Sequence, residues 1–146
     1  MKKMSLMCLA VALLALVPKS GDATEVTLSQ VTFPERNEIE IDFVRDQRAP
    51  EATMVAEVKY REGQADMNIR FREMKPAILF SGDVTCYVLW AVTRDGTAEN
   101  MGELWVREAS ETVEYSTGQK SFAMLVTAEA HPLVSMPSEL VMFRSL

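Results

Sequence analysis

The chain has 146 residues, of which 25% are charged, and its formal net charge is −6 at pH 7. This length is typical of one domain with a core of ordinary size. An acidic surface repels the phosphates of nucleic acids, so the composition argues against nucleic-acid binding.

The first 23 residues have the order of a secretory signal peptide. Two lysines precede an apolar run over residues 4–17, and the small residues Gly21 and Ala23 favour cleavage after Ala23. Because this run is shorter than the roughly 20 residues that span a bilayer as a helix, cleavage is favoured over retention as an anchor. No second long apolar run follows in the sequence. We therefore expect residues 24–146 to be periplasmic or secreted, without a membrane span.

Cleavage would change both the charge and the cysteine content. It would remove three lysines and one aspartate, which makes the remaining chain more acidic. Cys8 would leave with the signal peptide, and Met7 before it does not fit the small residue of a lipidation site, so we expect no lipid anchor. Cys86 would then be the only cysteine, which excludes an intramolecular disulfide. Its apolar surroundings predict a small buried hydrophobe.

Short segments of alternating hydrophobicity predict strands in the first half of the chain. Residues 26–33 alternate loosely before a proline, whereas residues 38–44 alternate strictly between apolar and acidic side chains. A charged loop over residues 45–50 follows. Two further strands, residues 54–60 and 67–71, are joined by a turn around a glycine.

The second half of the chain continues in the same way. Residues 85–93 are apolar on both faces, which predicts a central strand covered on both sides. The Asp95-Gly96 pair predicts a hairpin turn into a strand over residues 98–107, with a bulge at Gly102. The last predicted strands are residues 111–116, 122–130 and 140–143. Together these segments predict an all-β fold: an immunoglobulin-like antiparallel β-sandwich of about seven or eight strands, forming one domain over residues 24–146.

Candidate chemistry is sparse in this sequence. His131, the only histidine, precedes a proline and is expected at the surface, without the partners that acid–base catalysis needs. A blue-copper site built on Cys86, His131 and Met136 would lack its second histidine. Asp83 and the acidic residues near it do not have the spacing of a calcium loop, and no Gly-x-Ser-x-Gly or Gly-rich phosphate motif occurs. We expect no catalytic residues, no cofactor and no metal.

The two tryptophans have different expected roles. Trp90 shares a strand face with valines and is expected in the core. Trp105 shares a predicted strand face with Glu103 and Arg107, opposite apolar neighbours, so it is expected at the surface. These three residues form the predicted interaction surface.

The second half of the chain resembles a known family of domains. The residues that carry this resemblance are 87–92, Asp95-Gly96, Asn100, 102–104, 122–129 and 137–138. Residues 76–143 resemble a β-sandwich module of bacterial envelope proteins, which in some of them precedes an outer-membrane-protein-A-like peptidoglycan-binding domain. They are more distantly similar to the extracytoplasmic C-terminal region of anti-sigma-K factors. The resemblance implies a fold and an envelope location; the sequence shows neither neighbouring domain, so the activities of those domains do not carry over.

These observations predict an exported, non-enzymatic β-sandwich that contacts other envelope proteins or itself. An unpaired sheet edge, expected at residues 26–33 or 140–143, is one way to accept a partner strand. The alternative is a carbohydrate or small-ligand binding module that uses Trp105 and nearby acidic groups. A hydrolytic enzyme that depends on His131 is the least supported reading.

Overall fold

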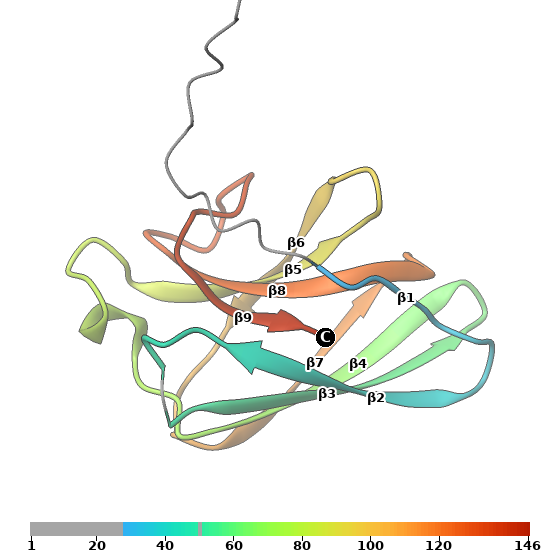
Figure 1. Cartoon of the computed structure of the whole chain (residues 1–146), viewed down its shortest axis with the longest axis horizontal. Helices are drawn as coiled ribbons and strands as arrows, with labels where there is room; N and C mark the ends of the chain where they lie inside the picture. Colours follow the sequence, from blue (N-terminus) through green and yellow to red (C-terminus); the bar gives the residue numbers. More distant parts are fainter. Residues whose placement is uncertain (1–27, 50) are drawn as a thin grey trace, which may run out of the picture.

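A computed structural model describes residues 28–49 and 51–146 of the chain (Figure 1). The predicted signal peptide, residues 1–23, and its cleavage site lie outside the described residues. In chain order the described elements are β1 (Val31–Thr32), β2 (Glu38–Arg45), β3 (Thr53–Arg61), β4 (Gln64–Arg72), the 3₁₀ turn η1 (Ala77–Leu79), β5 (Cys86–Val92), β6 (Ala98–Leu104), β7 (Glu111–Thr117), β8 (Ser121–Glu129) and β9 (Val141–Ser145).

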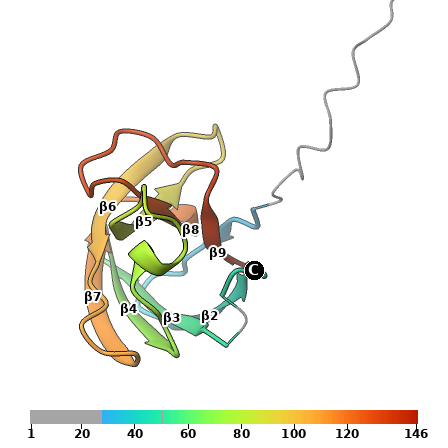
Figure 2. The same ribbon diagram turned by 90° about the vertical axis from the view of Figure 1, so that its left-hand side faces the viewer.

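The strands form antiparallel ladders in the order β6-β5-β8-β9-β2-β3-β4-β7, with β1 beside the start of β8. Figure 1 shows two layers, one made of β6, β5, β8 and β9 and the other of β2, β3, β4 and β7. The layers are joined where Phe43–Arg45 of β2 pairs with Phe143–Ser145 of β9. The sheet curls until its two end strands, β6 and β7, lie near each other without forming a ladder (Figure 2). The predicted antiparallel all-β sandwich is confirmed.

Of the two predicted sheet edges, the one at residues 140–143 is wrong. β9 lies in the interior of the sheet, between β8 and β2, and β1 is a two-residue strand beside β8. The end strands are β6 and β7. Alternation of apolar residues indicates which face of a strand is buried, but it does not indicate which strands are neighbours.

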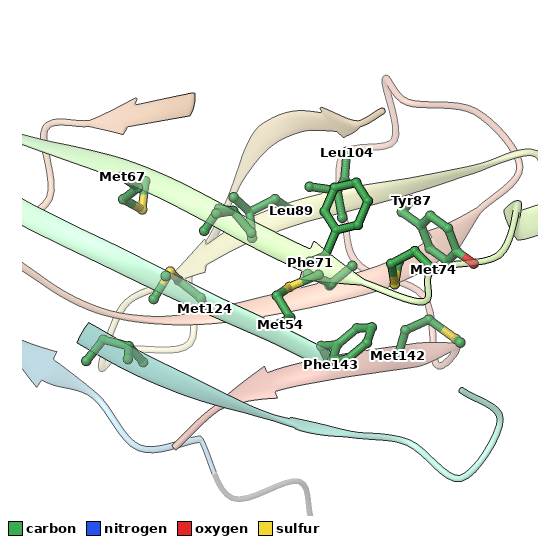
Figure 3. Packing of buried hydrophobic residues seen from close by; sticks show 14 of the residues in the cluster. Met54, Met67, Phe71, Met74, Tyr87, Leu89, Leu104, Met124, Met142 and Phe143 are labelled. Atoms are coloured by element: carbon green, nitrogen blue, oxygen red, sulfur yellow. The ribbon is translucent and has the colours of Figure 1, made fainter. Parts of the chain in front are cut away.

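The main core lies between the two layers (Figure 3). Alternate residues of the β3–β4 hairpin point into it, which explains the strict burial pattern of β4. The labelled side chains include five methionines, Met54, Met67, Met74, Met124 and Met142. Unbranched thioether side chains fill irregular spaces between strands that cross at an angle.

A second apolar cluster covers the outer face of β5 and β8. It contains Cys86, Val88, Trp90, Val92 and Leu125, and Leu28 and Val134 pack against it. All residues of β5 are therefore buried, which confirms the prediction of a strand covered on both sides. Within this cluster Trp90 Nε1 donates a hydrogen bond of 2.8 Å to Thr127 Oγ1, so the buried indole N–H is satisfied.

Two glycines have the conformations that the sequence predicted. Gly96 has a φ of +85° in the β5–β6 turn. There the Asp95 carboxylate accepts hydrogen bonds from the Thr93 hydroxyl and from the backbone and hydroxyl of Thr97, and these bonds lower the pKa of Asp95. Gly102 has a φ of +114° beside the register shift between β5 and β6, which confirms the predicted bulge.

Candidate functional site

Four connections meet at one end of the sandwich, which we call the loop end. They are the segments after β2, β4, β6 and β8, that is, residues 46–52, 73–85, 105–110 and 130–140. Because neighbouring strands are antiparallel, segments that follow every second strand leave the sheet at the same end. Figure 2 views the molecule from this side, with η1 near the centre of the view.

Hydrogen bonds hold these connections to one another. The N–H of Met74 donates to the Ala109 carbonyl at 3.0 Å, which joins the β4–β5 and β6–β7 connections. Thr85 donates its N–H to the Glu129 carbonyl and its hydroxyl to the Ala130 carbonyl, both at 2.8 Å, which joins the β4–β5 connection to the end of β8. The connections after β4, β6 and β8 are therefore joined to one another by hydrogen bonds.

The β4–β5 connection leaves two adjacent aliphatic side chains in solvent. Met74, Ala77 and Val84 are buried and fix the ends of this connection in the core. Between them η1 turns Ile78 and Leu79 outward, where 57% and 68% of their surfaces are exposed. Two large apolar residues exposed side by side are unusual on a protein surface that contacts only water.

The predicted surface residues Glu103, Trp105 and Arg107 do not share one strand. β6 ends at Leu104, so Glu103 lies in the strand and is partly buried, whereas Trp105 and Arg107 lie in the connection that follows. In this connection the Glu111 carboxylate accepts a hydrogen bond from the Arg107 N–H at 3.0 Å, where the chain turns toward β7. The side chain of Trp105 is 56% exposed, which confirms its predicted surface position.

The β8–β9 connection is fixed across the outer face of its layer. Asn100 Nδ2 donates to the carbonyls of Pro132 and Val134, at 2.9 and 2.8 Å. The buried carboxylate of Glu129 accepts a hydrogen bond of 2.8 Å from the Ser138 N–H. This anchored connection exposes Leu133 and Met136, and His131 is also exposed.

One group of residues defines the candidate site. Of the large hydrophobic residues that are exposed in the described part of the chain, all but Leu146 belong to loop-end connections: Ile78, Leu79, Trp105, Leu133 and Met136. We call this set the apolar loop end. Sequence reasoning found only Trp105. The other four are apolar residues in connections that contain prolines. A search for alternation within strands does not detect such residues.

A small cavity lies within the loop end. Its volume is about 20 Å³, which is room for about one water molecule. Its floor is apolar and includes Phe80, Tyr87 and Phe143, and its lining also contains the charged residues Arg48, Glu51, Glu73 and Lys75. The Tyr87 hydroxyl donates to the Lys75 carbonyl, and burial raises the pKa of Tyr87. The cavity is therefore too small for a cofactor.

Reactive side chains do not converge on this end. Cys86 is buried in the outer-face cluster, and burial raises the pKa of its thiol, with a further contribution from the charges of Glu103 and Glu129. Within residues 28–49 and 51–146, no group of three His, Cys, Asp or Glu side chains is arranged to hold a metal ion. Over the same residues, no helix has the length and hydrophobicity needed to cross a membrane.

Comparisons with known proteins found no match to any protein-family model, to any curated protein or to any solved structure.

Proposed function

We propose that this chain is an exported, non-enzymatic envelope protein that binds another protein through the apolar loop end. The observation that carries the proposal is that the connections that follow β4, β6 and β8 all expose large apolar side chains, namely Ile78, Leu79, Trp105, Leu133 and Met136. Exposed apolar patches on soluble domains mark contact surfaces, and tryptophan is among the residues that contribute most to protein binding.

The hydrogen bonds between the connections support the same proposal. Bonds such as Met74 N–H to the Ala109 carbonyl hold the apolar residues in place before any partner arrives. A surface that is already ordered loses less conformational entropy on binding, so more of the contact energy appears as affinity.

The proposed location rests on the sequence. Lysines, an apolar run and small residues in the first 23 positions are those of a signal peptide, and the acidic net charge of −6 disfavours nucleic acids as partners. Periplasmic or secreted placement is therefore part of the proposal, together with partners that are other envelope proteins.

The test is chemical crosslinking of the protein in the intact envelope of cells that produce it, followed by mass spectrometry. The wild type should give a reproducible crosslink to one partner protein. A triple variant with serine in place of Ile78, Leu79 and Trp105 should lose this crosslink. The matched control is Leu146→Ser, which removes an exposed leucine outside the loop end. Partner recovery that is unchanged in the triple variant would contradict the proposal, provided the variant's circular dichroism spectrum matches that of the wild type.

A second candidate function is binding of a carbohydrate or small ligand at Trp105, with Glu103 and Arg107 nearby in sequence. An exposed indole beside charged groups is a common platform for sugars. Trp90 is fully buried, so a ligand-induced change in tryptophan fluorescence would report on Trp105. Titration with cell-wall sugars should quench the wild type and leave Trp105→Phe unchanged if this candidate holds. Absence of quenching into the millimolar range would remove it.

A further inference from the structure

The methionines of this domain differ sharply in how far solvent can reach their thioethers. Five belong to the main core and are at most 4% exposed, namely Met54, Met67, Met74, Met124 and Met142 (Figure 3). Met101 is half-buried against the same core. Met136, in the β8–β9 connection, is 74% exposed. Within residues 28–49 and 51–146 it is therefore the one methionine with a fully accessible sulfur.

The backbone on both sides of Met136 is fixed by hydrogen bonds. Before it, the Asn100 amide donates to the Val134 carbonyl at 2.8 Å. After it, the Ser138 N–H donates to the buried Glu129 carboxylate, and the Ser138 hydroxyl donates to a carbonyl of β8. None of these bonds uses an atom of the Met136 side chain. A chemical change at its sulfur therefore leaves the path of the connection intact.

An accessible thioether reacts with oxidants that transfer an oxygen atom, such as hydrogen peroxide. The sulfur lone pair attacks one peroxide oxygen, the O–O bond breaks, and the proton on the transferred oxygen passes to the departing hydroxide. The products are a sulfoxide and water, so the sulfur loses the two electrons that the peroxide gains. The sulfoxide is polar and accepts hydrogen bonds, whereas the thioether is apolar.

Burial protects the core methionines from the same reaction. The oxidant cannot reach a sulfur that is covered by the close-packed interior. A sulfoxide formed there would also be a polar group without a hydrogen-bond partner, which is costly in an apolar core. Oxidation of the folded protein is therefore directed to the loop end and away from the residues that hold the two layers together.

We propose that Met136 is a site of oxidative modification, and that its conversion to the sulfoxide weakens the binding of a partner protein at the apolar loop end. The reduced side chain contributes apolar contact surface, and the sulfoxide removes that contribution while the fold stays intact. The loss of affinity rests on the proposed function, because it requires the loop end to be a contact surface. The selectivity for Met136 does not.

The first experiment measures selectivity on the protein purified from the compartment in which it accumulates. Hydrogen peroxide is added, and peptide mass spectrometry follows the gain of one oxygen atom at each methionine over time. Met136 should be oxidised about tenfold or more faster than the core methionines, while the circular dichroism spectrum stays that of the untreated protein. Equal rates at Met136 and at the core methionines, or unfolding in step with oxidation of Met136, would overturn the proposal.

A phenyl column then measures the effect of oxidation on the surface. Peroxide-treated wild type should be retained less strongly than untreated wild type, because an exposed apolar group has become polar. Met136→Leu cannot take up oxygen at this position, so peroxide should not change its retention. A loss of retention in Met136→Leu equal to that in the wild type would assign the effect to another residue and contradict the proposal.

The crosslinking assay in the intact envelope connects the modification to binding. Met136→Gln places a polar amide near the position of the sulfoxide, and its crosslink should be about threefold or more weaker than that of the wild type. The matched control is Leu146→Gln, an exposed position outside the loop end, which should crosslink like the wild type. A wild type without any crosslinked partner would refute the proposed function. A wild-type crosslink that persists undiminished in Met136→Gln would refute the role of Met136 alone.

Discussion

At the residue scale, two tyrosines connect the interior of the sandwich to backbone carbonyls. Tyr87 Oη donates to the Lys75 carbonyl and Tyr115 Oη to the Glu103 carbonyl. Burial raises the pKa of both phenols, and for Tyr115 the charge of Glu103 adds to the effect. Each hydroxyl therefore stabilises the fold only while it is neutral, because its phenolate would be desolvated and could not donate.

These raised pKa values predict a loss of stability in alkaline solution. A folded-state pKa above the unfolded value of about 10 contributes stability that is fully present below pH ~10 and is lost as the pH rises further. The free energy of unfolding, measured by denaturant titration between pH 8 and 11.5, should fall above pH 10. In Tyr115→Phe the free energy of unfolding should fall less steeply with pH. At pH 8 it should be about 1 kcal/mol lower than in the wild type, because one hydrogen bond is lost. Parallel pH profiles for the variant and the wild type would contradict this account.

At the element scale, the sequence determined individual strands better than their arrangement. Residues 85–93 are so apolar that the sequence alone predicted burial on both faces of the strand. The Asp95-Gly96 turn and the Gly102 bulge were predictable because the backbone there needs a positive φ, which glycine adopts readily. The pairing of β9 between β8 and β2 depends on long-range contacts, which no local pattern encodes. The same limit applies to the candidate site, since Ile78 and Leu133 lie far apart in the chain and only the antiparallel order brings their connections to one end.

The anchoring of the β8–β9 connection leads to a prediction for Asn100. Its amide donates to two carbonyls of that connection and its Oδ1 accepts from Gly102. Asn100→Ala should lower the free energy of unfolding by about 1–3 kcal/mol, because these partly buried bonds are lost together. Hydrogen exchange of residues 133–139 should accelerate more than exchange in β3 and β4. Arg94→Ala, an exposed change in the β5–β6 turn, is the control, and equal exchange in both variants would count against the anchoring role.

At the scale of the whole molecule, the buried clusters and the exposed apolar side chains lie in different parts of the fold. The methionine-rich core and the outer-face cluster hold the layers, while the loop end carries the exposed apolar side chains. The turns at the opposite end of the sandwich are short and polar, as in the Asp95-Gly96 turn. This asymmetry is what a domain needs in order to present one contact surface from a rigid frame.

The most direct measurement is site-specific photo-crosslinking in the living cell. A photoreactive amino acid replaces Trp105 at the loop end or Thr97, an exposed residue of the β5–β6 turn at the opposite end. Our account predicts one reproducible protein adduct from position 105 and none from position 97. The same adducts from both positions, or no adduct from position 105 in the folded and exported protein, would contradict it.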